Sequence, residues 1–370
     1  MNFAFSEEQE ELRAAVRRFL AEKSPEPEVR RLMETVAGYD PKVWRQAACQ
    51  LGLPGLAIPE KFGGSGFGYA ELTVVFEEMG RALLCAPFFS TVALAANLLL
   101  SAEDEVAKAD YLPGLASGEV IATVALAEPS GRWDEGGVQV PATRADGTWM
   151  LTGEKLFVLD GTIADLILVA ARAPAGVSVF TVDKHAPGLV VEPLATMDQT
   201  RKQARVLLRA TPARLVGTEG AGWAAVSRML DLAAVALAAE QVGGAQRVLD
   251  MAVQYAKTRV QFGKPIGSFQ AIKHKCADML IEVESARSAA YYGCFVAEDP
   301  DELPVAASLA KAYCSEAYLH AAAENIQIHG GIGFTWEHPA HLYFKRAKSS
   351  ELLFGDPAYH RELLAQRIGI

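Results

Sequence analysis

The sequence is poor in cysteine and has no excess of positive charge. Its 370 residues include five cysteines, which are widely scattered and form no Cys-x-x-Cys pair. An odd number of dispersed cysteines is typical of free thiols in a reducing compartment rather than of a disulfide framework, and it offers no metal-ligand spacing. The formal net charge is −10. This argues against nucleic acid as the main partner, because binding to nucleic acid depends on a basic surface.

Membrane spans and targeting signals are also missing from the sequence. The most apolar run, residues 232–239, is bracketed by Asp231 and Glu240 and is too short to cross a bilayer. The N-terminal stretch MNFAFSEEQEELRAAV is acidic and amphipathic, unlike the basic start and apolar middle of a signal peptide. We therefore expect a cytoplasmic protein without membrane insertion. The hydrophobic content of 51% is enough to bury the cores of two or three domains.

Composition divides the chain into three parts. Residues 1–117 read as helical, with Ser6 placed to cap the first helix. Residues 118–221 contain short β-branched runs separated by Gly, Pro or Asp, which predict a barrel or sandwich. Residues 222–370 are helical again and rich in alanine, which favours close helix packing. We predict an α+β protein with an N-terminal helical domain, a middle β domain and a C-terminal antiparallel four-helix bundle.

The expected elements can be stated as ranges. The expected strands are 119–126, 138–144, 149–152, 155–159, 166–171, 177–182, 189–191 and 205–208. The main expected helices after the first are 69–83, 87–100, 104–115, 223–258, 268–297, 304–329, 338–350 and 357–367.

The segment Arg259–Gln270, RVQFGKPIGSFQ, interrupts the helical C-terminal part. Gly263, Pro265 and Gly267 end the preceding helix, and Ser268 is a favourable N-cap for the next one. An arginine, an aromatic ring and a glutamine are thus placed at a tight helix–helix turn. There they can present a cation and an apolar face to a ligand outside the helix pair.

With the segments PEKFGGSGFG, ALAEP, RVQFGKPIGSFQ and QIHGGIGF in this order, the chain resembles the acyl-CoA dehydrogenase family over essentially its whole length. The combination of R-x-x-F-G with Q-x-x-G-G-x-G is the more specific part of the likeness. The resemblance implies FAD as cofactor, an acyl-CoA thioester as substrate and a flavoprotein as electron acceptor. In such enzymes the α hydrogen leaves as a proton and the β hydrogen passes to the flavin as hydride. This chemistry needs a carboxylate base and hydrogen-bond donors to the thioester oxygen.

In the family, the two glycine-containing segments reach across a subunit interface to the nucleotide end of a neighbour's FAD. The residues that the resemblance assigns to this role are Arg259, Phe262, Gln270, Gln327, Gly330, Gly331 and Gly333. Arg259 would pair with phosphate oxygens, and Phe262 would pack on the adenine side. The two glutamines would make polar contacts, and the glycines would let the backbone approach the cofactor.

Both family positions for the catalytic base lack a carboxylate. The resemblance places one base position at Phe354 and the other at Ala233. Glu351, Asp356 and Asp231 are the nearby carboxylates, and Glu351 is the fallback candidate. These carboxylates stand two or three positions from the two base positions, so their side chains start from other points of the backbone and none of them replaces the base directly.

The segments that would hold the chain's own flavin ring also depart from the family. Thr-Glu-Pro is replaced by Ala127-Glu128-Pro129, and Gly-Ser-Asp by Arg132-Trp133-Asp134. Phe157-Val158-Leu159 stands where the family has Trp-Ile-Thr, and Asp356 and Ala358 stand where it has Thr and Gln. The chain thus keeps the contacts it would lend to a neighbour's FAD and lacks most of those to its own.

Four interpretations follow. We favour the non-catalytic subunit of an α2β2 heterotetramer, which completes the FAD site of a catalytic dehydrogenase partner; such complexes occur in bacterial degradation of steroid side chains as CoA thioesters. A homotetramer with a displaced base is an alternative, in which Ala127 and Ala233 leave room for an unusual acyl group. A flavin-dependent monooxygenase on the same fold would need no base. A non-enzymatic scaffold or acyl-CoA-binding protein is the fourth.

Overall fold

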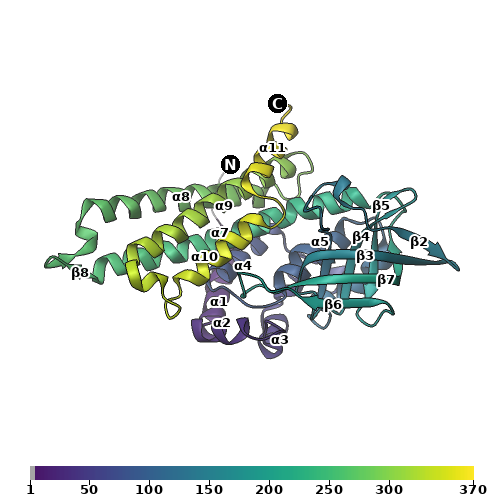
Figure 1. Ribbon diagram of the computed structural model, residues 1–370, viewed down its shortest axis with the longest axis horizontal. Helices are drawn as coiled ribbons and strands as arrows, with labels where there is room; N and C mark the ends of the chain where they lie inside the picture. Colours follow the sequence, from purple (N-terminus) through teal and green to yellow (C-terminus); the bar gives the residue numbers. More distant parts are fainter. Residues whose placement is uncertain (1–4) are drawn as a thin grey trace. The chain divides into compact units, whose positions relative to one another are not determined.

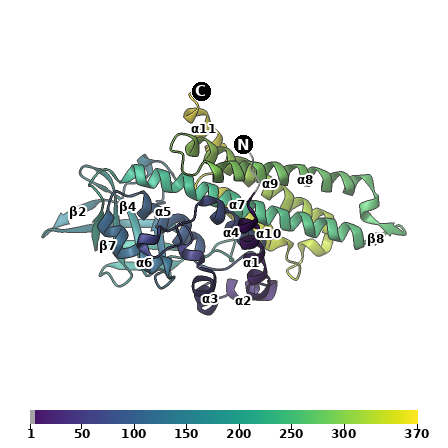
Figure 2. The same ribbon diagram turned by 180° about the vertical axis from the view of Figure 1, so that it is seen from behind.

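The computed structural model of the chain describes residues 5–370, and their contacts group them into two compact units. Unit 1 contains the chain up to Val29, Tyr69–Leu84 and Ala234–Ile370; unit 2 contains Arg30–Gly68 and Cys85–Ala233. Figures 1 and 2 show the elements from opposite sides. The first four residues of the stretch considered for a targeting signal lie outside the described residues. The predicted domain boundaries near 117 and 221 follow composition rather than compactness, and they stay a prediction.

Unit 1 is helical. Its helices are α1 (Glu7–Lys23), the start of α2 (Glu26–Met33), α4 (Tyr69–Arg81), the part of α7 (Gly222–Thr258) from Ala234 on, α8 (Gln270–Phe295), α9 (Glu302–His329), α10 (Ala340–Leu352) and α11 (Pro357–Arg367). Ser6 caps α1 as predicted, in a reciprocal capping box with Gln9. The predicted cap Ser268 is wrong: it lies in the short 3-10 helix Ile266–Ser268, and Phe269 precedes α8 without a side-chain cap.

Small residues set the spacing of these helices. Alanines of α7, α8 and α9 meet in one buried cluster, made of Ala238, Val242, Ala286, Ala290, Ala310, Cys314 and Ala317. Two glycines allow α4 to cross α7. A Cβ on Gly80 would lie 1.9 Å from the carbonyl oxygen of Glu240, and one on Gly243 would lie 1.8 Å from that of Glu77. The predicted close helix packing is therefore confirmed, and only glycine fits at this crossing.

A buried carboxylate joins three helices of unit 1. Glu77 on α4 accepts hydrogen bonds from Arg13 of α1 (2.7 Å) and from the hydroxyl of Tyr291 on α8 (2.8 Å), and it also pairs with Arg287 of α8. Burial alone would raise the pKa of Glu77, but the two arginines outweigh that effect and hold it below its usual value. α1 and α4 are thus tied to the bundle by charge as well as by packing.

Unit 2 is built around a seven-stranded sheet. The strands are β1 (Ala122–Ala125), β2 (Ala142–Ala145), β3 (Thr148–Leu159), β4 (Leu166–Ala173), β5 (Gly176–Asp183), β6 (Leu189–Pro193) and β7 (Gln203–Val216), in the order β1-β4-β5-β7-β3-β2 with β6 also paired to β7. Only the β1–β4 pair is parallel among the named strands. The predicted α+β class is confirmed. The two predicted strands 149–152 and 155–159 form the single strand β3, with a register shift between Leu151 and Gly153.

Helices of unit 2 accompany the sheet. They are α3 (Pro41–Leu51), a π-helix at Phe89–Ala96, α5 (Asn97–Ser101) and α6 (Glu105–Ala116). The helix predicted over 87–100 is therefore present, although its first part is wound more widely than an α-helix. Among residues 5–370, α7 is the one helix with the length and composition of a membrane span. Because 72% of its most apolar window is buried within the structure, it has the character of a core helix.

Candidate functional site

A short hairpin connects α7 to α8 at one end of the helices of unit 1 (Figure 1). β8 (Val260–Gln261) pairs with β9 (Lys264–Pro265), and the turn residues Phe262 and Gly263 have φ angles of 53° and 77°. Two successive positive φ angles are typical of the type I′ turn that closes tight hairpins. This turn leaves Phe262 91% exposed. The exposed guanidinium of Arg259 has no hydrogen-bond or ion-pair partner within residues 5–370.

The second predicted segment follows the last turn of α9. Gln327 is exposed there, and the chain continues into the 3-10 helix η6 (Gly330–Phe334). A Cβ on Gly330 or Gly331 would meet nothing within 4 Å, so both glycines face open space. Gly333 differs, because a Cβ there would lie 2.8 Å from the carbonyl oxygen of Ile326. Packing within the chain already requires glycine at 333, whereas 330 and 331 leave room for a ligand.

An aromatic stack brings these two segments together. The ring of His329, at the end of α9, stacks on Tyr255 of α7 at a centroid distance of 4.3 Å, and His338 lies on it at 4.4 Å. Burial lowers the pKa of His329, so the neutral ring donates its Nδ1–H to the carbonyl oxygen of Asn325 at 2.8 Å. The stack fixes the hairpin and the glycine turn beside each other, which their separation in sequence does not reveal.

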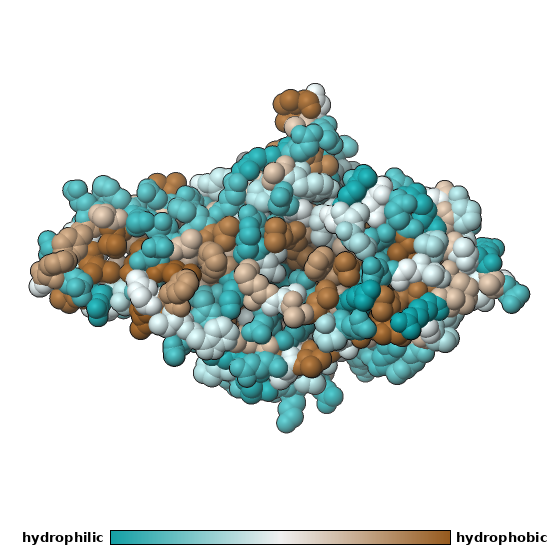
Figure 3. Space-filling model, in the orientation of Figure 1, coloured by the Kyte–Doolittle hydropathy of each residue, from teal (hydrophilic) through white to brown (hydrophobic). Residues whose placement is uncertain are grey.

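We name the exposed residues of these two segments the hairpin surface; its members are Arg259, Val260, Phe262, Gln270, Gln327, Gly330, Gly331, Ile332, Phe334 and Trp336. Phe262 and Phe334 are 91% and 85% exposed, and Figure 3 shows hydrophobic residues at the end of unit 1 that holds β8. Exposed aromatic and apolar side chains that gather in one patch are typical of a contact surface for a ligand or a partner. A cation beside aromatic rings and bare backbone suits a ligand with a flat ring system and phosphate groups.

The two turn glycines provide a test of local strain. Gly330 has φ 64° and ψ −142°, a backbone conformation that residues other than glycine avoid. Gly331 has no positive φ. We expect Gly330→Ala to lower the free energy of unfolding by about 1–3 kcal/mol, and Gly331→Ala to change it by less than about 0.5 kcal/mol. Urea unfolding followed by circular dichroism measures both. Equal effects of the two variants would contradict this strain.

The two family positions for the base are both buried. Phe354 lies between α10 and α11 with φ 61° and is 7% exposed. Ala233 lies within α7 and has no exposed surface. A phenyl ring and a methyl group cannot accept a proton, so neither side chain can act as the base that the family chemistry requires.

The nearby carboxylates are engaged in structural contacts. Glu351 forms an ion pair with Lys348 one turn earlier on α10. The Oδ1 atom of Asp356 accepts the backbone N–H of Tyr359 at 2.8 Å and so caps α11. Asp231 on α7 is 6% exposed. A role for Glu351 as a displaced base would require it to leave its lysine, and that role stays a prediction.

The backbone of the flavin-ring segments keeps a defined framework in unit 2. The backbone N–H of Leu156 donates to the carbonyl oxygen of Ala127 at 2.8 Å, which places the Ala-Glu-Pro and Phe-Val-Leu segments side by side. Beneath them, Glu128 accepts two backbone N–H groups and the ammonium of Lys155 at 2.6 Å. Burial lowers the pKa of Lys155 to about 8, although Glu128 opposes that effect. The framework is kept, while Ala127 and Leu159 offer no side-chain hydroxyl.

The remaining predicted segment lies on the surface of unit 2. Arg132 and Asp134 pair with each other at 2.8 Å and are 58% and 47% exposed in their side chains. Asp134 also caps the short helix Glu135–Gly137. Phe157 has φ 55° and is 49% exposed. These side chains do not reproduce the hydroxyl and amide donors that the family places around the flavin.

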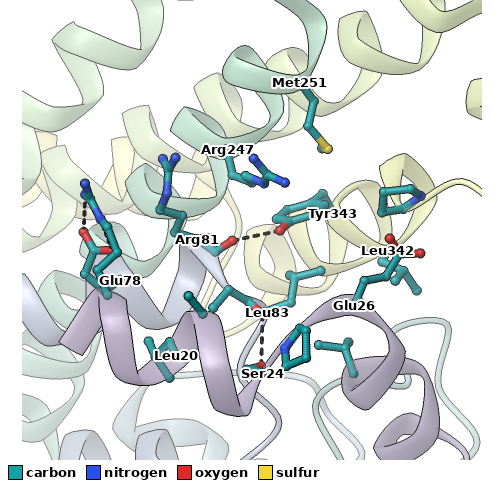
Figure 4. A pocket seen from close by; sticks show the side chains of 16 residues that line it. Leu20, Ser24, Glu26, Glu78, Arg81, Leu83, Arg247, Met251, Leu342 and Tyr343 are labelled. Atoms are coloured by element: carbon teal, nitrogen blue, oxygen red, sulfur yellow. Dashed lines mark hydrogen bonds and ion pairs between the residues drawn. The ribbon is translucent and has the colours of Figure 1, made fainter. Parts of the chain in front are cut away.

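A separate cavity of about 240 Å³ lies between α1, α2, α4, α7 and α10 (Figure 4). Arg17, Arg81 and Arg247 line it, but Arg17 pairs with Glu78 and Arg81 with Asp250, while Arg247 contacts a tyrosine hydroxyl. Carboxylates of the protein therefore balance two of the three positive charges, and the third guanidinium is hydrogen-bonded to Tyr343. None of the predicted site residues lines this cavity, and we assign it no ligand.

Sequence reasoning missed two features near the predicted site. One is the stack of Tyr255 with His329 and His338, in which the tyrosine is far in sequence from the two histidines. The other is Lys311, which lies on α9 with no exposed surface and is hydrogen-bonded to the segment that contains Phe354. A signal for Lys311 was available, since the lysine stands within an otherwise apolar, alanine-rich stretch, SLAKAYC.

Known protein families match the chain over most of its length. Three family models match: "Acyl-CoA dehydrogenase, N-terminal domain" over residues 6–119, "middle domain" over 123–206 and "C-terminal domain" over 220–369. The acyl-CoA dehydrogenase IpdE2 of Mycolicibacterium smegmatis is 40% identical over 356 residues, covering 95% of this chain and 96% of that protein.

Two solved structures extend the comparison. The ChsE4–ChsE5 complex from Mycobacterium tuberculosis superposes with a TM-score of 0.91 at 30% identity, covering 100% of this chain and 99% of the matched one. The Tcur3481–Tcur3483 steroid ACAD variant gives a TM-score of 0.89 at 33% identity and covers 98% of each chain. The chain therefore belongs to the acyl-CoA dehydrogenase family, whose members are FAD-dependent flavoprotein oxidoreductases.

Proposed function

We propose that this chain is the FAD-site-completing, non-catalytic subunit of an α2β2 acyl-CoA dehydrogenase. One observation carries the proposal: Phe354 and Ala233 stand at both base positions, while the hairpin surface is intact and exposed. The chain has the groups that would bind the nucleotide end of a neighbour's FAD, and it lacks the carboxylate base that would act on a substrate of its own. Bound in a catalytic partner, FAD would supply the acceptor for the β hydrogen, and this chain would hold the nucleotide end in place.

The chemistry of the hairpin surface suits that role. A guanidinium presents parallel N–H donors that match two phosphate oxygens, and Arg259 offers them without a competing carboxylate among the described residues. Phe262 provides an exposed aromatic face for a purine ring. The bare backbone at Gly330 and Gly331 allows close approach of the cofactor. Gln270 and Gln327, both exposed, add polar contacts to the ribose and adenine.

The comparisons support a two-component assembly and a bulky substrate. Two similar solved structures carry the names of two proteins each, and one of them is described as a steroid ACAD. We propose a second acyl-CoA dehydrogenase subunit as partner, a steroid side chain or another bulky acyl group as its CoA thioester, and a flavoprotein as electron acceptor. All five cysteines are free thiols, which suits a reducing intracellular compartment.

Co-purification tests the proposal. The chain is produced alone and together with the product of the neighbouring reading frame, and the flavin absorbance of each preparation is recorded. We expect the chain alone to be insoluble or nearly colourless, and the co-expressed complex to be yellow and active on acyl-CoA. A yellow, active homotetramer formed by this chain alone would refute the proposal and support the displaced base.

A further inference from the structure

A buried lysine lies directly against the segment that contains Phe354. Lys311, in the middle of α9, has no exposed surface. Its ammonium donates to the carbonyl oxygen of Gly355 at 2.8 Å, to that of Glu351 at 3.0 Å and to the hydroxyl of Ser315 at 3.2 Å. The ammonium has three N–H groups and the neutral amine has two, so the three acceptors engage every N–H group in either form and none remains for a substrate.

The segment that Lys311 contacts has an unusual backbone. Phe354 and Gly355 have φ angles of 61° and 106°, and the first of these is costly for a residue with a side chain. The neighbouring carbonyl oxygen of Phe354 accepts a hydrogen bond from Nε2 of His360 at 3.1 Å. Burial lowers the pKa of His360 to about 3, so this ring is a neutral donor. The lysine and the histidine therefore bind the main chain at residues 351, 354 and 355.

A second polar contact anchors the lysine to the rest of unit 1. The Ser315 hydroxyl that accepts from Lys311 also accepts from the side-chain amide of Gln241 on α7 at 3.0 Å. Gln241 is 1% exposed and Ser315 has no exposed surface. The chain thus maintains a buried polar line from α7 through α9 to residues 351–355. Burying an ammonium is costly unless its hydrogen bonds are satisfied, which makes a packing-only explanation for a lysine unsatisfactory.

We propose that Lys311 is a positioning residue, which fixes the backbone of residues 353–356 and thereby sets where the side chain at position 354 is held. The grip is on main-chain oxygens, so it does not depend on which side chain occupies 354. The inference therefore holds whether or not the proposed subunit role is correct. The phenylalanine at the base position 354 therefore changes only the side chain, while the backbone of that segment is still held by Lys311.

The titration of Lys311 gives this role a signature. Burial lowers its pKa from 10.5 to about 7, against the raising effect of Glu351 and Asp356. The other titratable neighbours of Lys311 are His360 and Cys314. Burial raises the pKa of the Cys314 thiol to about 12. If residues 353–356 open only when Lys311 enters water, the open state binds a proton above pH 7 that the closed state does not. Raising the pH must then favour the closed state, by up to about fifty-fold between pH 7 and 9.

Amide hydrogen exchange of the assembled protein tests this proposal, with rates corrected for intrinsic pH dependence. Wild-type amides of residues 353–356 should become better protected between pH 7 and 9. Lys311→Met should speed their exchange about tenfold or more, because buried carbonyl groups lose their donors, and should remove the pH trend. Lys311→Gln keeps a donor without a charge, so it should retain part of the protection and show no trend. The hairpin amides of residues 259–264 and 266 serve as the internal control and should not change.

Two results would overturn the proposal. Protection in the wild type that is flat or falls from pH 7 to 9 would mean that opening of residues 353–356 does not hydrate Lys311. A pH trend that persists in Lys311→Gln would assign the trend to another group. The wild-type profile decides the question even if Lys311→Met fails to fold. Slower folding or lower overall stability alone would not produce a trend confined to these amides.

Discussion

Arg259→Ala is expected to remove most of the FAD from the assembled complex while both subunits stay folded. The Arg259 side chain is exposed on the hairpin surface, so its removal leaves no buried partner unpaired. Hydrogen bonds from a guanidinium to a charged group are worth about 1.5–3 kcal/mol, which corresponds to a loss of about 10- to 150-fold in FAD affinity. The ratio of flavin to protein after gel filtration, and titration of the flavin-free complex with FAD, measure the loss.

Two matched variants sharpen this test. Arg259→Lys keeps the charge but loses the paired N–H donors, so FAD affinity should fall less than in Arg259→Ala. Arg45 on α3 is also exposed and belongs to unit 2, so Arg45→Ala should retain FAD at the wild-type level. Full FAD content in Arg259→Ala, or an equal loss in Arg45→Ala, would rule out the proposed phosphate contact.

The second large effect concerns stability. Arg346 on α10 pairs with Glu240 on α7 at 2.8 Å, and the two residues are 3% and 5% exposed. We expect Arg346→Met to lower the free energy of unfolding by about 3–5 kcal/mol, because it leaves the charge of Glu240 buried without this partner. The urea midpoint of the variant, compared with that of the wild type, gives the change.

A double variant separates the cost of removing one partner from the value of the pair. Replacing both residues with methionine should recover much of the lost stability, since apolar replacement of a buried pair is often nearly neutral. The exposed pair of Arg361 with Glu316 is the matched control. Arg361→Met should cost less than about 1 kcal/mol, because solvent screens exposed pairs. If the two single variants were equally destabilised, burial would not be the source of the effect.

Long helices of this chain were predictable because their signal is local. The predicted range 357–367 coincides with α11. The predicted helix 223–258 ends at the same residue as α7 and begins one residue later than α7 does. The register of β3 across Gly153 was not predictable, because it depends on pairing with β7. The capping prediction for Ser268 failed for a similar reason: the chain bends back there, with the N–H of Ile266 bonded to the carbonyl oxygen of Arg259. Tertiary contacts decide such positions.

The candidate site was predictable as a list of residues but not as an arrangement. The resemblance of the sequence to a family supplied Arg259, Phe262 and the glycines. Periodicity could not show that Tyr255 and His329 stack and hold the two segments together. It also could not show that Gly333 packs against its own helix. The grip of Lys311 on residues 351 and 355 joins positions that are 40 and 44 residues away in the chain.

The crossing of α4 over α7 limits how this protein can be divided. Gly80 and Gly243 bring the two backbones into contact. Glu77 of α4 forms ion pairs with Arg13 of α1 and Arg287 of α8. A fragment that began after α4 would expose the bare face of α7 and leave Arg287 without its main carboxylate. The bundle that carries the hairpin surface is therefore completed by the first and fourth helices of the chain. Shortening the protein to its C-terminal family domain would remove part of the fold on which that surface rests.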